Sequence, residues 1–280
     1  ACRLIGIDVS LERAKSLLEQ MRHDVMLVSA EQQQLRVEVA PYRNDIMHEV
    51  DLIEDLAIAY DYQNIVPSLV PNLTVAQERE DRKLANRARQ AMLGMGFFEA
   101  MSLLLSSPQE QYASVGLSDP GEAVVIDNPA SVEQSIMRTH ILPQLLRLFG
   151  VNRGQGLPQR LFEVDDVVIL PQSETYPRER LHLAAGLLDT GVGFADIKAV
   201  CEALLFELGL SATYRPVEHP AFLPGRVAEI LLDNKPLGIL GEIHPRILEQ
   251  EELRLLQPLA VMELCLQDLL PKEDLYHLGS

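Results

Sequence analysis

The sequence predicts an α+β protein of two domains, the larger of which is an antiparallel or mixed sheet with helices on it. Three observations support this prediction. The chain has 280 residues, 47% of them apolar, which is enough for two domains with filled cores. Residues 66–76 contain two prolines and no periodic apolar stripe, as is typical of a linker. Beyond this linker, long apolar strand-like runs alternate with hairpin turns and a few helical stripes.

The residues before the linker are predicted to follow the order β-α-β-β-α. Ser10 is a good N-cap for a helix whose apolar residues recur on one face. A polar stretch separates two apolar runs that are predicted to pair as a hairpin. The expected elements are a strand at 3–9, a helix at 11–21, a hairpin from 25–28 and 35–39, and a helix that follows Pro41 and ends near Tyr60.

The residues after the linker are predicted to be richer in strands. Asp233-Asn-Lys is a turn-prone sequence between two apolar runs, so it predicts a hairpin. The expected helices are at 77–94, 141–149, 196–208 and 243–252. The expected strands are at 97–105, 124–129, 160–170, 182–188, 227–232, 236–241 and 259–264.

Composition limits the class of protein. The net charge of −17 argues against nonspecific binding of nucleic acid by the whole surface. No apolar run approaches the length of a membrane span. Three widely spaced cysteines, Cys2, Cys201 and Cys265, fit neither a disulfide framework nor a metal site, which favours a reducing compartment. Cys201 and Cys265 lie in apolar runs and are expected to be buried. The first residues have no targeting pattern and no initiator Met, so we expect a chain cut from a longer one.

Common catalytic motifs are absent from the sequence. It has no Walker loop, no GxSxG, no HExxH and no GxGxxG after a strand. The seven histidines are scattered without metal-ligand spacing. Glu163, Asp165 and Asp166 could belong to a site, although charges at a strand edge are the more ordinary interpretation. A group of basic residues alternates with acids and predicts a solvated, mixed-charge helix face: Arg79, Arg82, Lys83, Arg87 and Arg89.

Four acidic residues crowd the front of the helix that follows Pro41: Asp45, Asp51, Glu54 and Asp55. The last three stand at i, i+3 and i+4, so they share one helical face. Each adjacent pair of like charges costs about 0.2–0.5 kcal/mol unless a cation neutralises it. Oxygen ligands alone suit magnesium or calcium. Acids in a first turn are also favoured by the helix dipole, so the residues alone leave both a metal site and helix-end electrostatics open.

Residues 41–65, which begin Pro41-Tyr-Arg-Asn-Asp-Ile-Met-His-Glu-Val and end Asn64-Ile65, closely resemble the B5 domain of the phenylalanyl-tRNA synthetase beta subunit. The resemblance is to the archaeal and eukaryotic form. It implies that the four acids are magnesium positions, with Asp55 standing where the family more usually has Glu. It also implies a small winged-helix-like B5 domain at 1–67, followed by a linker at 68–76.

A weaker resemblance continues downstream, to the synthetase-like domain of the same subunit. It is carried by Asp127-Asn-Pro129, Ser135-Ile-Met-Arg-Thr-His-Ile-Leu-Pro143, Leu161-Phe-Glu-Val and Gly238-Ile-Leu-Gly-Glu-Ile-His-Pro245. This resemblance implies a class II aminoacyl-tRNA synthetase-like antiparallel sheet, flanked by helices, at 77–280. The helix at 77–94 and the strand at 97–105 would be the analogue of motif 1, the usual class II dimer surface.

The resemblance also implies that this copy of the fold is catalytically silent. Motif 2 needs an Arg two residues before a Glu, but Leu161 stands two before Glu163 and Arg160 points to the opposite strand face. Motif 3 needs an Arg on a helix entered from a Gly-rich strand. Gly238 and Gly241 are similar to that pattern, but Arg246 lies beyond a proline. The loss of a positive clamp on the transferring phosphate should remove activity.

The resemblance implies a cytoplasmic subunit of an enzyme that joins phenylalanine to its tRNA with ATP and Mg²⁺. The expected partners are the alpha subunit, two alpha chains with two beta chains, and the tRNA for phenylalanine. This chain would have a structural, alpha-assembling and tRNA-supporting role. Two other hypotheses stay open: a chain that activates an amino acid by itself, and a freestanding nucleic-acid-binding or interaction module. Residues 1–70 carry 6 Lys and Arg against 12 Asp and Glu, which disfavours the module.

Overall fold

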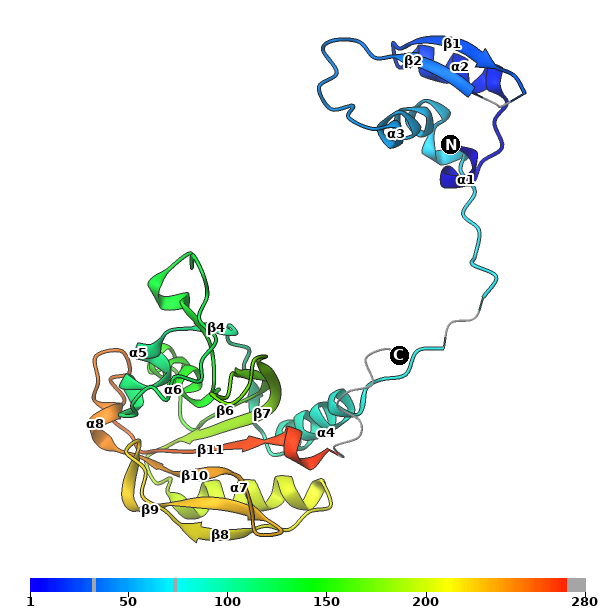
Figure 1. Ribbon diagram of the computed structural model, residues 1–280. Coiled ribbons are helices and arrows are strands. Elements are labelled where there is room, and N and C mark those ends of the chain that lie inside the picture. Colours follow the sequence, from blue (N-terminus) through cyan, green and yellow to red (C-terminus); the bar gives the residue numbers. More distant parts are fainter. Residues whose placement is uncertain (32–33, 73–74, 271–280) are drawn as a thin grey trace. The chain divides into compact units, whose positions relative to one another are not determined.

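The structure is a computed structural model that describes residues 1–31, 34–72 and 75–270. Parts of the predicted hairpin loop and linker, and the last ten residues of the predicted larger domain, lie outside the described residues. The chain divides into two compact units, Ala1–Ala76 and Gln77–Ser280, and each is described by itself (Figure 1). Described residues from 65 to 79 carry no helix or strand.

The first unit packs two helices against a two-stranded hairpin. Its elements are α1 (Cys2–Ile5), α2 (Leu11–Gln20), β1 (Asp24–Ser29), β2 (Gln34–Glu38), α3 (Glu49–Tyr60) and the 3₁₀ turn η1 (Tyr62–Asn64). Ser10 caps α2 as predicted, because its side chain accepts a hydrogen bond from the Arg13 backbone N–H. The core consists of Leu17 and Leu18 from α2, Val25 from β1 and Leu56 from α3. The apolar stripe of α2 therefore faces the hairpin and α3.

The predicted strand at 3–9 is wrong. Residues Cys2–Ile5 form a single helical turn that ends at Gly6, whose φ of 81° is in the left-handed region that favours glycine. β1 and β2 pair only with each other among the described residues, so a strand at 3–9 would have no ladder to satisfy its backbone groups.

The second unit is built on a seven-stranded sheet with the order β3-β6-β7-β11-β10-β9-β8. The pair β3–β6 is parallel and the other pairs are antiparallel, so the sheet is mixed. The strands are β3 (Phe98–Glu99), β6 (Gln159–Ile169), β7 (Arg178–Leu188), β8 (Thr213–Pro216), β9 (Phe222–Leu232), β10 (Lys235–Ile243) and β11 (Leu259–Cys265). Asp233 and Asn234 both have positive φ, as the tight turn between β9 and β10 requires.

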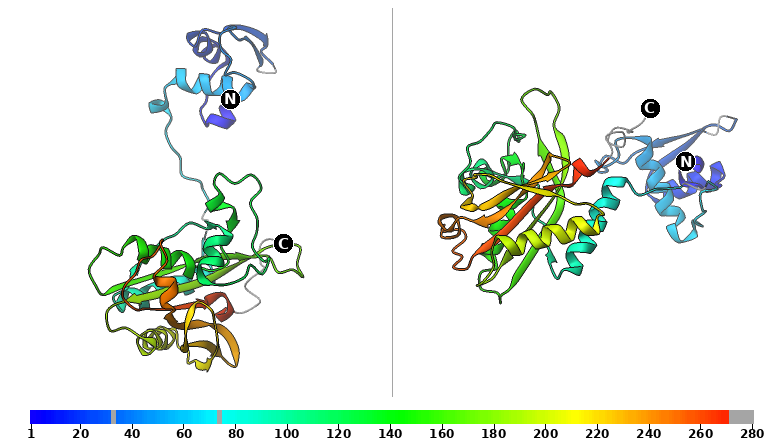
Figure 2. Two further views of the ribbon diagram at one scale, coloured as in Figure 1. Left: turned by 90° about the vertical axis from the view of Figure 1, so that its left-hand side faces the viewer. Right: turned by 90° about the horizontal axis from the view of Figure 1, so that it is seen from below.

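Helices cover both faces of this sheet (Figures 1 and 2). One face packs against α4 (Glu80–Gly94) and α7 (Phe194–Glu207), and the buried thiol of Cys201 belongs to this core. The other face packs against α6 (Leu142–Val151), whose Phe149 lies in a second core. Neighbouring strand residues alternate between the two cores, with Leu183 in the first and Ala184 in the second. Cys265 is buried as well, so both predictions of buried thiols are confirmed.

Three element predictions in the second unit need correction. The expected buried strand at 97–105 is reduced to β3, because the chain leaves the sheet edge and exposes Met101. No strand forms at 124–129, where the described backbone makes an isolated bridge between Val125 and Ile136. The helix at 243–252 is only the turn α8 (Pro245–Leu248), because β10 continues to Ile243.

Short elements complete the second unit. They are β4 (Leu105–Ser106), α5 (Pro108–Gln111), η2 (Ala113–Val115), η3 (Val132–Gln134), β5 (Ile136–Met137) and η4 (Leu266–Leu269). Within the described ranges, no helix is both long enough and apolar enough to cross a membrane.

Candidate functional site

Two of the four predicted acids bind the same arginine in the first unit. Arg43 lies in the segment between β2 and α3. Its Nε and Nη2 donate to the two carboxylate oxygens of Asp45 at 3.0 and 2.7 Å. Its Nη1 lies 2.9 Å from Asp55 Oδ2, and its Nη2 lies 3.1 Å from Asp55 Oδ1. The hydrogen bond from Arg43 lowers the pKa of Asp45, so this carboxylate stays ionised.

Asp55 is also bound by a histidine from the other helix. It lies on α3 with 4% of its surface exposed, and His23, just after α2, places Nε2 2.8 Å from its Oδ2. Burial alone would raise the pKa of Asp55, but the hydrogen bonds from Arg43 and His23 outweigh it and lower the pKa. Asp55 is therefore a buried anion with two cationic or donor partners.

Asp51 caps α3. Its Oδ2 accepts the backbone N–H groups of Met47 and His48, both at 2.8 Å, and His48 Nδ1 accepts the N–H of Val50 in return. These backbone hydrogen bonds lower the pKa of Asp51. Glu54 is exposed on the same helix. Helix-end electrostatics, one of the two interpretations of the sequence, is thus realised at Asp51.

The four acids do not gather around a common point. In the part of the chain that the structure describes, no group of three or more His, Cys, Asp or Glu side chains is arranged to hold a metal ion. Mg²⁺ prefers an octahedron of oxygens at about 2.0–2.1 Å. The carboxylate oxygens of Asp45 and Asp55 instead accept hydrogen bonds from Arg43 and form ion pairs with it. The side chains as they stand do not fit magnesium, and the magnesium site stays a prediction of the sequence.

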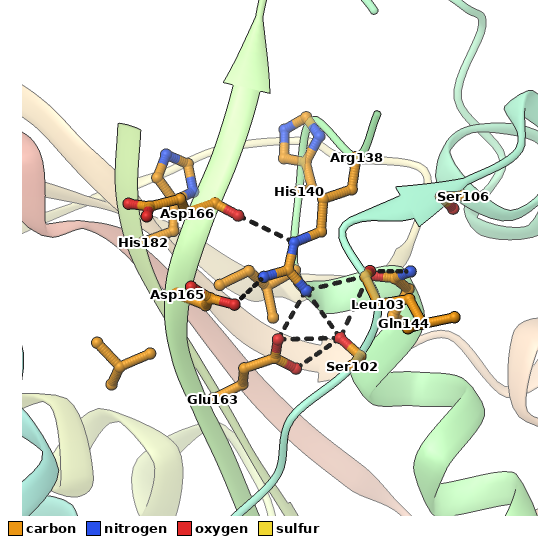
Figure 3. Close-up of polar contacts among 12 residues, drawn as sticks. Ser102, Leu103, Ser106, Arg138, His140, Gln144, Glu163, Asp165, Asp166 and His182 are labelled. Carbon is orange, nitrogen blue, oxygen red and sulfur yellow. Dashed lines mark hydrogen bonds and ion pairs between the residues drawn. The ribbon is translucent and has the colours of Figure 1, made fainter. Parts of the chain in front are cut away.

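A second charged cluster lies on the α6 face of the large sheet, around Arg138 (Figure 3). Arg138 has no exposed surface, and its Nη1 donates to Glu163 Oε1 at 2.6 Å. Its Nε donates to the backbone oxygen of Asp166 at 3.0 Å, and its Nη2 lies 3.2 Å from Asp165 Oδ2. Burial of a charged arginine costs desolvation free energy. The hydrogen bonds and ion pairs of Arg138 offset this cost.

Two more side chains tie the cluster to its surroundings. Ser102 accepts from Arg138 Nη1 at 2.8 Å and donates to Glu163 Oε2 at 2.7 Å. Gln144 on α6 accepts from Arg138 at 3.2 Å and donates to the carbonyls of Leu103 and Leu105. Glu163 is 1% exposed, on a strand flanked by β3 and β7. The prediction that Glu163 is a strand-edge charge is therefore wrong.

The neighbouring strands carry a second buried ion pair. Glu263 on β11 accepts the backbone N–H groups of Ile141 and Leu142, each at 3.0 Å, at the start of α6. His182 on β7 places Nδ1 2.8 Å from Glu263 Oε1. The sequence suggested no special role for either residue. The one local signal of Arg138 is that it directly follows the apolar pair Ile136 and Met137.

The structure shows where the residues compared with synthetase motifs 2 and 3 lie. Arg160 points out of the cluster, and its Nη1 donates to the carbonyl of Met95 at 3.1 Å. Arg246 donates to the carbonyl of Pro220. Gly238 and Gly241 lie where a Cβ would collide with the backbone of adjacent strands, at 2.1 and 2.5 Å. These glycines allow close strand packing.

Three of the basic residues of α4 also have partners. Arg82 binds Asp166 at 2.7 Å, Lys83 binds Glu80, and Arg89 binds Glu99. The prediction of a mixed-charge helix face is confirmed for these residues.

The fold is similar to that of a solved class II aminoacyl-tRNA synthetase. A pyrrolysyl-tRNA synthetase of Desulfitobacterium hafniense superimposes with a TM-score of 0.57 over 70% of this chain and 69% of that chain. The sequence identity is 16%, so this similarity concerns the fold alone.

The chain belongs to the phenylalanyl-tRNA synthetase beta chain family. Residues 66–266 match the family model of the phenylalanyl-tRNA synthetase beta chain CLM domain, and residues 1–62 match that of the tRNA synthetase B5 domain. Phenylalanine–tRNA ligase beta subunits of Archaeoglobus fulgidus and Methanopyrus kandleri are 37% and 36% identical over 93% and 90% of this chain. The chain spans about half the length of these relatives, 46% and 48%. The family predicted from residues 41–65 and the downstream segments is confirmed.

Proposed function

We propose that this chain is the structural part of a phenylalanine–tRNA ligase beta subunit, and that it assembles with a catalytic alpha subunit. The enzyme would attach phenylalanine to its tRNA with ATP and Mg²⁺ in the cytoplasm. The single observation that carries the structural role is that Glu163 is 1% exposed and is hydrogen-bonded to Arg138 and Ser102 of its own chain. A glutamate that is buried and bound in this way is not presented to a substrate.

Two further observations support a silent site. Arg160 is engaged with the Met95 carbonyl, so no arginine near Glu163 is free to hold a phosphate among the residues described here. A pocket of about 470 Å³ in the second unit is lined by residues of α5, α6 and α8, and by none of the side chains that bind Arg138. We infer that this chain does not activate an amino acid by itself.

The alpha contact is proposed at the motif 1 analogue, residues 77–105. Here α4 leads into the edge strand β3, and the segment exposes large apolar side chains. Phe98 is 73% exposed, Met101 is 89% exposed, and Leu93 and Leu103 are exposed as well. Exposed apolar side chains on a short edge strand favour a protein partner. The winged-helix-like form of the first unit and the two-alpha, two-beta assembly belong to the same proposal.

Mixing the purified chains tests this function. We expect the alpha chain and this chain to elute together in size-exclusion chromatography at micromolar concentration. Phe98→Asp with Met101→Asp should weaken the complex by at least roughly tenfold, because charges would be buried without partners. Phe206→Asp on α7 is the matched control, since Phe206 is also highly exposed but lies outside residues 77–105.

ATP–pyrophosphate exchange is measured on the same fractions. Phenylalanine-dependent exchange should appear only in fractions that contain the alpha chain. Separate elution of the two wild-type chains would contradict the assembly role, and exchange by this chain alone would establish the catalytic alternative.

A further inference from the structure

Two of the four acids that the resemblance assigns to a metal, Asp45 and Asp55, already have a cation from their own chain. Arg43 presents three nitrogens to Asp45 and Asp55, at 2.7 to 3.1 Å. The fork of a guanidinium matches carboxylate oxygens in pairs, which a point charge cannot do. The arginine therefore satisfies both carboxylates at once.

The geometry leaves little room for a divalent ion at the buried acid. Asp55 Oδ1 accepts Arg43 Nη2, and Asp55 Oδ2 faces both Arg43 Nη1 and His23 Nε2. A magnesium ion on Asp55 would have to displace Arg43 and bring a second positive charge beside it. Mg²⁺ loses its water reluctantly, so displacement of a bidentate arginine is unfavourable.

These contacts also join three separate segments of the first unit. His23 lies between α2 and β1, Arg43 and Asp45 lie between β2 and α3, and Asp55 lies inside α3. A pair of helices and a two-stranded hairpin make only a small hydrophobic core. The ion pairs that connect these segments therefore contribute substantially to the stability of the first unit.

We propose that Arg43, assisted by His23, is the resident counter-cation of Asp45 and Asp55 and holds the first unit together without a divalent metal. The proposal concerns the first unit alone and does not rest on the function proposed for the whole chain. It replaces the magnesium assignment of Asp45 and Asp55 by an internal ion pair.

Hydrogen exchange of the full chain, followed by mass spectrometry, tests the proposal. Amide exchange in peptides that cover 18–24 and 43–60 is compared in 5 mM MgCl₂ and in EDTA. In the wild-type chain we expect equal protection in both buffers, because no metal contributes. In Arg43→Gln we expect exchange that is faster by roughly tenfold or more in these peptides.

A matched control and a metal response sharpen the test. Arg36→Gln removes the same charge from an exposed position on β2, and it should leave protection of 43–60 unchanged. In Arg43→Gln, Mg²⁺ should restore part of the protection, since Asp45 and Asp55 would then lack their arginine. Protection of the wild-type peptides that rises with Mg²⁺ and falls with EDTA would overturn the proposal, as would unchanged exchange in Arg43→Gln.

Discussion

His182 on β7 and Glu263 on β11 form a buried ion pair across two neighbouring central strands. Burial favours the neutral form of His182, but its hydrogen bonds to Cys265 and Glu263 prevail and raise its pKa to about 9. Burial likewise opposes ionisation of Glu263, yet the bond to His182, the nearby charge of His140 and the Ile141 N–H lower its pKa to about 2. Both groups are therefore charged at neutral pH, and the pair joins β7, β11 and the start of α6.

This pair should make the stability of the protein depend on pH. Because folding raises its pKa, His182 stabilises the folded state fully below pH 6.5. This contribution is lost as pH rises through about 9. Because folding lowers its pKa, Glu263 stabilises the folded state fully above pH 4.5. This contribution is lost as pH falls through about 2. We expect the unfolding free energy to fall by roughly 3 kcal/mol between pH 6.5 and 9, measured by urea denaturation. His182→Gln should lose most of that slope, and an equal slope in the variant would exclude His182 as its source.

At the scale of elements, α6 and β7 approach each other through a glycine. A Cβ at Gly186 would lie 2.6 Å from Phe149 Cε2 and 2.9 Å from its Cζ. Phe149 is fully buried in the core between α6 and the sheet. The glycine therefore permits the ring of Phe149 to approach β7 closely, and this contact packs α6 against the sheet.

We expect Gly186→Ala to destabilise the protein by about 1–3 kcal/mol, because the added methyl group overpacks a filled core. Thermal or urea unfolding measures the change. Gly191→Ala is the control, since nothing lies within 4 Å of its Cβ position, and it should change stability by less than about 0.5 kcal/mol. Adding Phe149→Leu to Gly186→Ala should recover part of the loss. If the two alanine variants are equally stable, the close approach is not what requires glycine.

At the scale of the whole molecule, the negative net charge disfavours binding of nucleic acid by the isolated chain. The net charge is −17, and residues 1–70 are acidic by themselves, with 12 Asp and Glu against 6 Lys and Arg. Arg79, just before α4, and three basic residues of α4 form ion pairs with acids. Binding of a nucleic-acid backbone needs free positive charge, so the tRNA-supporting role proposed above is expected to depend on the alpha chain.

We therefore expect the isolated chain to bind tRNA with a Kd weaker than about 100 μM at 150 mM salt, as measured by filter binding. Addition of the alpha chain should restore tight binding. An isolated chain that binds tRNA tightly, with affinity that falls steeply as salt rises, would show that this surface holds a basic patch of its own.

Local patterns were sufficient for most elements of the protein. Apolar stripes with a period near 3.6 predicted α2, α4, α6 and α7, and continuous or alternating apolar runs predicted the hairpins and the strands of the large sheet. The turn at Asp233 and Asn234 followed from its residue types. The family followed from a long run of residues at 41–65, and the comparisons confirmed it.

Elements that depend on a distant partner could not be predicted in this way. The apolar run at 97–105 looks like a buried strand, but only Phe98 and Glu99 find a neighbour in β6. The strand expected at 3–9 has no ladder to join. Apolar character records a preference for burial, and it does not say which surface will cover a segment.

The sequence by itself determined the main helices and strands and the family. Only the tertiary structure decided how the charges are used. Arg43 binds Asp55, which lies twelve residues away in the sequence, and Arg138, just after β5, binds Glu163 on β6. No local sequence pattern predicts either pair. Secondary structure follows from short-range periodicity, whereas the partner of a buried charge is chosen by the fold that brings the two together.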